Sequence, residues 1–134
     1  MRLEGASICQ AVREISGGWD ADGLGLTGLL LDEPRQLTIP IMLCFIGESD
    51  DTEGASCSFA YRVTAPADNI MQHGVSAVGR DIGTAPQLVD PERYLIPLWL
   101  DFHVDQDGVY VVDIEAERGT SLRLPLRVAL GPQW

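Results

Sequence analysis

Apolar and polar residues alternate along most of this chain, and the alternation is clearest across residues 94–130, YLIPLWLDFHVDQDGVYVVDIEAERGTSLRLPLRVAL. Three successive runs in this stretch have an apolar residue at every second position, and turn-forming residues separate the runs. Alternation of this kind is typical of β-strands that bury one face. We therefore predict three consecutive antiparallel strands, arranged as a meander.

The last two of these runs predict a hairpin whose register is set by its charged side chains. One face is apolar, with Tyr110, Val112, Ile114 and Ala116 on the first strand and Leu122, Leu124, Leu126, Val128 and Leu130 on the second. The opposite face carries Asp113, Glu115 and Glu117 on one strand and Arg123 and Arg127 on the other. Acids then lie beside bases, and each good pair adds roughly 0.2–1 kcal/mol. Residues 117–119 are expected to form the loop, with Gly119 in the left-handed conformation.

Further strands are predicted upstream from the same alternation and from the turn residues between the runs. They cover residues 6–13, 24–31, 37–46 and 57–64, and the loop after the first of them contains Asp20 and Asp22. Residues 70–78 fit a strand or one short helical turn, and residues 79–91 fit a long irregular loop. Pro40 has no N–H to donate to a sheet, so it predicts an edge position or a bulge in the strand 37–46.

Short strands that follow one another closely, without a convincing amphipathic helix, are typical of all-β proteins. We predict an antiparallel two-sheet sandwich of about seven to eight strands. A chain of 134 residues can bury roughly two thirds of its unfolded surface, so we expect residues 1–134 to form a single domain. The predicted core contains Leu43, Phe45, Phe59, Tyr61, Leu100, Phe102, Tyr110, Val112, Ile114, Leu124 and Leu126.

Three stretches carry recognisable strand motifs. They are the opening ASICQAVRE with the glycine-containing strand LGLTGLLL, the strand LTIPIMLCF, and the closing hairpin DGVYVVDIEAERGTSLRLPLRV. In these stretches the chain resembles a family of small, uncharacterised bacterial β-sandwich proteins, a domain of unknown function. The closing hairpin also resembles those of many immunoglobulin-like domains. The resemblance implies a bacterial, immunoglobulin-like sandwich without an established activity, and it carries no catalytic residues over to this chain.

Charge and composition narrow the classes of function. Nine Arg, no Lys and twenty Asp and Glu give a net charge of −11, which repels nucleic acid and anionic membranes. The absence of Lys excludes Schiff-base chemistry and a phosphate-loop lysine. Cys9, Cys44 and Cys57 lie within apolar strand patterns, as reduced core thiols do. There is no signal-peptide pattern and no apolar run long enough to span a membrane, so we expect a cytoplasmic protein.

Several partial catalytic and binding motifs are present, but none has the context that its chemistry requires. Gly23, Gly25 and Gly28 form a literal GxGxxG, yet Pro34 follows too soon for the helix of a dinucleotide site. The segment GVSAV, residues 74–78, lacks the final Gly of a nucleophile elbow. The histidines and cysteines have no zinc-ligand spacing, and nothing in the sequence brings a histidine to a nucleophile. We therefore predict neither an enzymatic activity nor a cofactor.

The acidic loops are the best candidates for a ligand site. Asp20 and Asp22 lie in one predicted loop, and Glu48, Asp50, Asp51 and Glu53 lie in another. Both loops follow strands of the same direction, so they are expected at one end of the sandwich. Calcium takes about six to eight oxygen ligands, which such loops can supply. A chain with twenty acids also places carboxylates in most of its loops, where they are simply solvated.

The strand 37–46 has a second face that is apolar as well. Met42, Cys44 and Ile46 lie opposite the predicted core positions of this strand. Either another part of the chain covers them, for which residues 79–91 are a candidate, or a second copy of the chain does. We predict a homodimer with Met42 and Ile46 at or near its interface.

These observations favour a non-catalytic protein-interaction module whose partner is unknown. The sequence places its apolar residues in sheets and offers no paired nucleophile and base. One alternative is a calcium- or small-ligand-binding sandwich that uses the acidic loops. A second alternative is an enzyme whose site is completed by a partner chain. Nucleic acid and membranes are not expected as partners.

Overall fold

The computed structural model of the chain describes residues 1–16, 18–47, 56–79 and 93–131. This part of the chain consists of strands and turns without a helix, so the prediction of an all-β protein is confirmed. It contains ten strands: β1 (Arg2–Ile8), β2 (Ala11–Ile15), β3 (Gly18–Asp22), β4 (Gly28–Leu31), β5 (Arg35–Ile46), β6 (Ser56–Thr64), β7 (Ile70–Gly79), β8 (Arg93–Val104), β9 (Gly108–Ala116) and β10 (Leu122–Leu130). Among these residues there is no helix with the length and apolar character to span a membrane.

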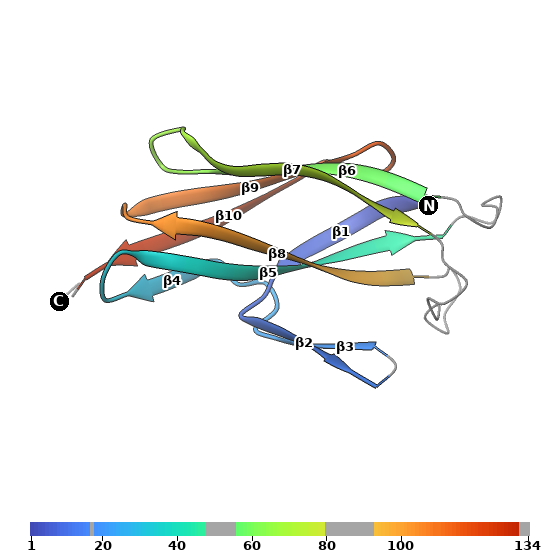
Figure 1. Ribbon diagram of the computed structural model, residues 1–134, viewed down its shortest axis with the longest axis horizontal. Helices are drawn as coiled ribbons and strands as arrows, with labels where there is room; N and C mark the ends of the chain where they lie inside the picture. The colour runs from blue at the N-terminus through green and yellow to red at the C-terminus, as the bar shows by residue number, and fades with distance from the viewer. Residues whose placement is uncertain (17, 48–55, 80–92, 132–134) are drawn as a thin grey trace.

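The ten described strands form three sheets rather than the two predicted (Figure 1). β1, β5 and β8 make an antiparallel three-stranded sheet with β5 in the centre. The five-stranded sheet has the order β4-β10-β9-β6-β7, and its neighbours are antiparallel except for β4, which runs parallel to β10. β2 and β3 form a separate hairpin below the three-stranded sheet in Figure 1. The strand count therefore exceeds the predicted seven to eight.

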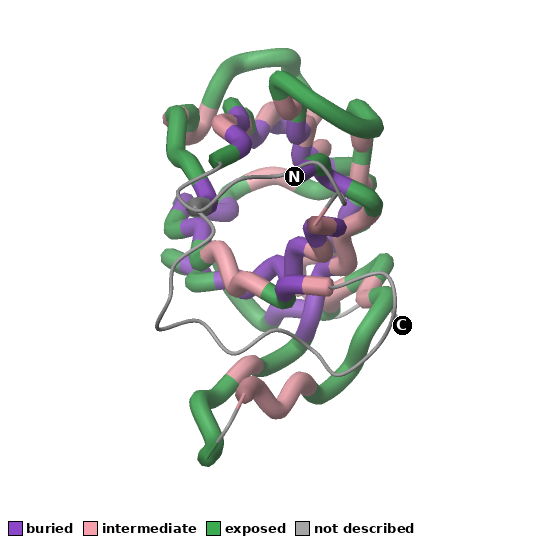
Figure 2. Tube along the Cα trace, turned by 90° about the vertical axis from the view of Figure 1, so that its right-hand side faces the viewer, coloured by how far each residue is buried: buried purple, intermediate pink, exposed green. Residues whose placement is uncertain are grey.

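The three-stranded and five-stranded sheets share one hydrophobic core, and the buried stretches of the trace line the interior in Figure 2. Alternate residues along each strand point into this core, because successive strand side chains face opposite sides. Nine of the predicted core residues are buried: Leu43, Phe45, Phe59, Leu100, Phe102, Tyr110, Val112, Ile114 and Leu126. Tyr61 and Leu124 are only partly buried, but they pack against the same core.

The predicted closing hairpin is confirmed in β9 and β10. Tyr110 pairs with Leu126, which places the two apolar sets of side chains on the same face. Arg123 pairs with Asp113 on the opposite face, and its Nε donates a hydrogen bond of 2.9 Å to the Asp113 carboxylate. The charged residues therefore mark the outer face of this hairpin, as the sequence predicted.

The loop of this hairpin packs against β1. It spans residues 117–121 and is longer than the three residues predicted, but Gly119 has the expected positive φ, 108°. The Leu3 N–H donates to the Arg118 carbonyl at 3.0 Å, and the Thr120 N–H donates to the Leu3 carbonyl at 3.1 Å. A side chain at position 119 would collide with the Leu3 backbone. Glycine at this position therefore allows β1 to bond to the loop.

The predicted meander is wrong, because β8 lies in the other sheet. β8 pairs with β5 from Arg93 opposite Ile46 to Val104 opposite Arg35. Residues 105–107 then carry the chain across to β9 in the five-stranded sheet. Alternation along a strand shows which of its faces is buried, but it does not show which strand lies beside it.

The chain between β1 and β4 also differs from the prediction. The strand predicted at residues 6–13 is split, because β1 ends at Ile8 and β2 begins at Ala11. Asp20 and Asp22, predicted in a loop, lie in β3 instead. The pattern of residues 6–13 is short and mixed, and no glycine or proline within it marks the break between the two strands.

Other segments were placed more accurately. Of residues 24–31 only the last four form a strand, β4, because Gly23 and Gly25 adopt positive φ angles in the turn before it. Residues 70–78 belong to the strand β7, which decides between the strand and the helical turn. The predicted loop at residues 79–91 lies outside the described residues from position 80 onwards.

Pro40 lies in the central strand of its sheet, so the predicted edge position is wrong. The register between β5 and β8 also passes through Pro40 without a shift, which rules out the predicted bulge. β1 pairs with β5 only as far as Ile8 opposite Ile41. The Pro40 carbonyl accepts from the Cys9 N–H at 2.9 Å, on the side where β1 has just ended. The missing N–H points to that same side, where no ladder partner requires it.

Candidate functional site

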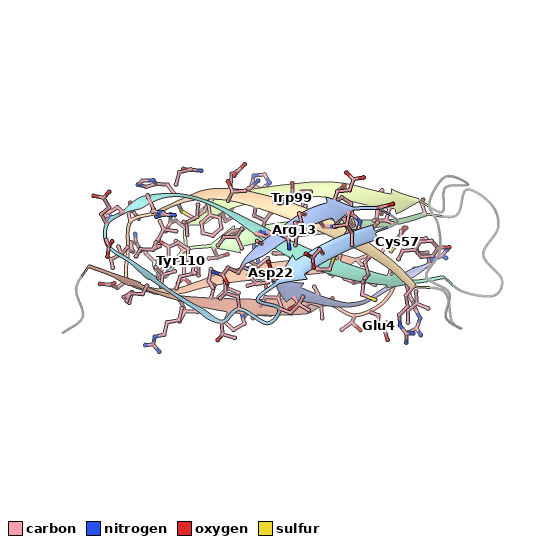
Figure 3. The ribbon with its side chains drawn as sticks, turned by 90° about the horizontal axis from the view of Figure 1, so that it is seen from below. Glu4, Arg13, Asp22, Cys57, Trp99 and Tyr110 are labelled. Carbon is pink, nitrogen blue, oxygen red and sulfur yellow. The ribbon has the colours of Figure 1, made fainter. Side chains whose placement is uncertain are left out.

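The second apolar face of β5 is partly covered by the β2–β3 hairpin. Pro40, Met42 and Ile46 are buried on this face, although it points away from the core. Figure 3, which looks at the molecule from the hairpin side, shows β2 and β3 lying across the three-stranded sheet. The sequence left open whether another part of the chain or a second copy covers this face. At Met42 the covering segment is the β2–β3 hairpin of the same chain. Residues 80–91, considered for that role, lie outside the described part.

A largely apolar groove remains between the hairpin and the sheet, with a volume of about 470 Å³. Met42 and Cys44 from β5 form its floor, and Trp19 and Ala21 from β3 face them. Leu95 from β8 lines one side. The groove exists because the hairpin bridges over the sheet without packing tightly on it, and this leaves apolar side chains accessible to a ligand.

Hydrogen bonds fix the base of the hairpin to the three-stranded sheet. The Gln10 N–H donates to the Asp22 carbonyl at 2.9 Å, which ties the two ends of the hairpin together. The Gly25 N–H donates to the Ser7 hydroxyl of β1 at 2.7 Å. These bonds position the hairpin over the sheet, so the groove has a defined width at this end.

Trp19 holds the body of the hairpin against the sheet. Its ring packs against the Trp99 ring on β8 in a T-shaped arrangement, with centroids 6.1 Å apart and an interplanar angle of 67°. Edge-to-face aromatic pairs contribute about 0.5–1.5 kcal/mol beyond their burial. Trp99 nevertheless stays 45% exposed, and Leu24 beside the groove stays 63% exposed. The margin of the groove is therefore an apolar surface in contact with water.

The polar end of the groove contains the Cys44 thiol and the Glu4 carboxylate, and the Arg93 guanidinium lies beside that carboxylate. Glu4 is the extra residue at an irregularity in the β1–β5 pairing, and its carboxylate accepts from the Arg93 Nε at 3.3 Å. The Cys44 thiol donates to the same carboxylate at 3.5 Å. Burial, followed by the Glu4 hydrogen bond and charge, raises the pKa of the Cys44 thiol. A thiol with a raised pKa carries little thiolate, so Cys44 is suited to lining the groove and poorly suited to nucleophilic attack.

The calcium candidates are only partly within the described structure. Arg13 donates to the Asp20 carboxylate from Nε at 2.8 Å and from its terminal nitrogen at 2.5 Å, and it lies 4.0 Å from Asp22. The Asp20 hydrogen bond and both negative charges raise the pKa of Arg13. A cation at these carboxylates would compete with that guanidinium. Across the described ranges, no three His, Cys, Asp or Glu side chains come together as a metal site.

The remaining calcium candidates lie outside the described residues: Glu48, Asp50, Asp51 and Glu53. A site that combines these acids with Asp20 and Asp22 therefore stays a prediction. Its geometric premise has changed, because Asp20 and Asp22 lie in the hairpin strand β3 and not in a loop after the first strand.

The residues predicted for a homodimer interface are buried within one chain. Met42 is 7% exposed and Ile46 is 6% exposed, so neither offers much surface to a second copy. The accessible apolar side chains near the groove are Leu24, Leu95 and Trp99. Alternation in β8 places Leu95 and Trp99 on the outer face of the sheet, and this signal was available in the sequence. The sequence gave no signal for the hairpin that forms the groove with them, because the contacts of the hairpin join distant parts of the chain.

Two of the partial motifs lie at or within strands of the five-stranded sheet. Gly28 begins the strand β4 and pairs with Arg127, so a strand follows the GxGxxG sequence where a dinucleotide site has a helix. Ser76 lies within β7 and pairs with Phe59 of β6. His73 is an exposed residue on this strand, whereas the exposed His103 lies on β8 in the other sheet.

Comparison with known proteins adds no further information about this site. No protein-family model matches the sequence, and no curated protein is significantly similar to it. The resemblance to small bacterial β-sandwich proteins therefore depends on the strand motifs alone, and any statement about function depends on the geometry of the groove.

Proposed function

We propose that this protein is a non-catalytic interaction module that binds an extended segment of a partner protein in the groove below the β2–β3 hairpin. The observation that carries the proposal is a groove of about 470 Å³ whose floor and walls are mainly apolar, next to exposed Leu24, Leu95 and Trp99. Accessible apolar surface of this kind marks partner sites on soluble proteins. The strands on both sides hold the groove open without a bound partner.

The charges around the groove favour a segment that combines apolar and basic residues. Glu4 lies at one end, where Arg93 balances it. Glu14 pairs with Trp19 across the hairpin, and Trp19 contacts the three-stranded sheet. Glu14 therefore lies on the hairpin face that is turned to the sheet, where its side chain is exposed. The chain as a whole carries a net charge of −11. A basic partner gains from this field both in affinity and in its rate of association.

The proposed fold for this module is an immunoglobulin-like sandwich with one added hairpin. Immunoglobulin domains place strands A, B and E in one sheet and strands G, F, C and C′ in the other. The orders β1-β5-β8 and β10-β9-β6-β7 correspond to these two sets in the same sequence along the chain. The β2–β3 hairpin is then an insertion after the first strand. Membership of a family of small bacterial sandwich proteins, inferred from the strand motifs, is part of the same proposal.

A pair of glycine substitutions tests the groove directly. Gly5 lines the groove, and a Cβ at this position meets no atom within 4 Å, so Gly5→Leu should fill the groove without strain. Gly18→Leu is the matched control. A Cβ there is equally free, and Gly18 pairs with Ile15 on the face of the hairpin that carries Arg13 and Asp20.

Peptides selected from a random phage-displayed library against the wild-type protein supply the ligands. We expect selected sequences to combine Leu, Ile or Phe with Arg or Lys, and to bind the wild type and the Gly18→Leu variant equally. Affinity for Gly5→Leu, measured by calorimetry, should fall at least about tenfold, or 1.4 kcal/mol. Equal affinity for both variants would place the binding site elsewhere. Selected peptides without basic residues would contradict the electrostatic argument alone.

Calorimetric titration with calcium separates this proposal from the calcium-binding alternative. Because Arg13 already binds the Asp20 carboxylate, we expect no heat of calcium binding from Asp20 and Asp22. A heat that disappears in an Asp20→Asn variant would favour the calcium site instead.

A further inference from the structure

Strand β7 is an edge of the five-stranded sheet and is ten residues long. It pairs with β6 on one side. On its other side, no backbone hydrogen bond to another described residue is formed. β8 of the other sheet approaches β7 at Gln72, whose side chain accepts from the Asp101 N–H at 2.9 Å. Alternate N–H and C=O groups along this side are therefore available to a further strand.

The sequence of β7, IMQHGVSAVG, lacks the features that usually protect an edge strand. It contains no Asp, Glu, Lys or Arg and no proline. A shift in the pairing with β6 occurs only at its beginning, next to Thr64 and Ile70. Val75 in the middle of the strand is 77% exposed, and Ile70 is 54% exposed. Edges of this length that are uncharged and partly apolar readily accept another strand.

The other edges of the two larger sheets are protected in the described structure. β8 contains Pro97, and the Asp101 N–H on this strand donates to the Gln72 side chain at 2.9 Å. β1 is bonded to the loop of the closing hairpin through Leu3 and Arg118. β4 is only four residues long. Of the four edge strands β1, β4, β7 and β8, β7 is the one that is long and lacks a protecting feature of this kind.

We propose that β7 pairs with β7 of a second copy of this chain, antiparallel and about a two-fold axis, so that the two five-stranded sheets become one continuous sheet. Two identical edges satisfy one another in this arrangement, and closed two-fold dimers are the commonest homo-oligomers. The proposed dimer leaves the groove free, so it goes beyond the peptide-binding function. It also moves the predicted interface from Met42 and Ile46 to β7.

Charge supports a second copy as the partner, despite the net charge of −11. β7 itself is uncharged, and β6 beside it carries only Arg62. Within the five-stranded sheet, the nearest strand with acids is β9, which contains Asp113 and Glu115 and lies two strands from the edge. In the other sheet, Asp101 of β8 lies next to β7, where its N–H donates to the Gln72 side chain at 2.9 Å and its carboxylate accepts from the Thr38 hydroxyl. Across the dimer, the two β9 strands would be five spacings of about 4.8 Å apart, or about 24 Å. This separation exceeds the Debye length of about 8 Å at physiological salt, so repulsion between the β9 acids of the two copies is largely screened.

The test compares two lysine substitutions at exposed apolar positions on opposite edges of the same sheet. Val75→Lys places a charge on β7, and Leu30→Lys, at a residue that is 61% exposed, places the same charge on β4. Both changes reduce the net negative charge by one, so a difference between them reports on the edge and not on overall charge. Sedimentation equilibrium over a range of protein concentrations measures association.

We expect wild type and Leu30→Lys to dimerise with the same dissociation constant, and Val75→Lys to dimerise at least about tenfold more weakly. Hydrogen exchange on the wild type gives a readout that does not depend on a variant. Amides of β7 that point away from β6 should become protected as the concentration rises. A wild type that stays monomeric, equal association of both variants, or concentration-dependent protection confined to other strands would overturn the proposal.

Discussion

Tyr110 has a buried hydroxyl group without a hydrogen-bond partner in the described part of the chain. The residue lies on β9 and is fully buried, with its ring centroid 5.7 Å from that of Phe102. Replacing it with Phe removes this hydroxyl and keeps the ring. We therefore expect Tyr110→Phe to increase the free energy of unfolding, whereas substitutions in protein cores usually decrease it.

The magnitude follows from two opposing terms. A buried polar group without a partner costs about 1–3 kcal/mol, because it has lost its hydrogen bonds to water. Removing the oxygen atom leaves a void on the order of 10 Å³, which costs only about 0.2 kcal/mol at 24 cal/mol per Å³. The net gain is then about 1–3 kcal/mol. For a domain of this size, the melting temperature should rise by about 4 °C for each kcal/mol.

Equilibrium unfolding in urea, followed by tryptophan fluorescence and by near-UV circular dichroism, measures this change. Coincident transitions with an unchanged slope against urea concentration would show that the native state alone has been altered. Tyr61→Phe is the matched control. The Tyr61 side chain is only partly buried at the margin of the same core, so removing its hydroxyl should change the unfolding free energy by less than about 0.5 kcal/mol.

A loss of more than about 0.5 kcal/mol in Tyr110→Phe would refute the reasoning. It would mean that the hydroxyl is bonded in solution, for instance to a buried water molecule. An equal gain in both variants would indicate a general effect of removing a hydroxyl, with no special cost at position 110.

Two further predictions concern the β1 edge and the groove. Gly119→Ala should lower the free energy of unfolding by at least about 3 kcal/mol, because a Cβ would collide with the backbone of β1. Gly131→Ala is the control: it also has a positive φ, but its Cβ would meet no atom, so the loss should be only about 1–2 kcal/mol. Thermal unfolding that shows the same loss in both variants would contradict the contact between Gly119 and β1. Glu4→Gln should lower the raised pKa of the Cys44 thiol, since it removes the carboxylate charge. More thiolate is then present at any pH below the pKa, so alkylation by iodoacetamide at pH 8 should be faster than in the wild type, and an unchanged pH profile would argue against the contact.

The sequence by itself determined which face is buried in β5, β6, β8, β9 and β10. In β9 and β10, alternation and charge together predicted the apolar face, an outer face on which acids lie beside bases, and the positive φ of Gly119. These features depend on neighbours that are close along the chain, and so local periodicity is sufficient to predict them.

The sequence also predicted half of the candidate site. Alternation in β5 showed that Met42, Cys44 and Ile46 form a second apolar face that something must cover. It did not show that a hairpin of the same chain covers Met42. Trp19 and Trp99 are 80 positions apart in sequence, and their contact depends on where both strands lie in the folded chain.

Only the tertiary structure decided which strands are neighbours. β8 follows the same alternation as β9 and β10, yet it pairs with β5 in the other sheet, and Asp20 and Asp22 belong to a strand where the composition suggested a loop. Strand pairing is set by the packing of the whole core, because any apolar face can in principle be buried against several others. The groove and the open edge of β7 are both consequences of that pairing, so neither could be derived from the pattern of residues along the chain.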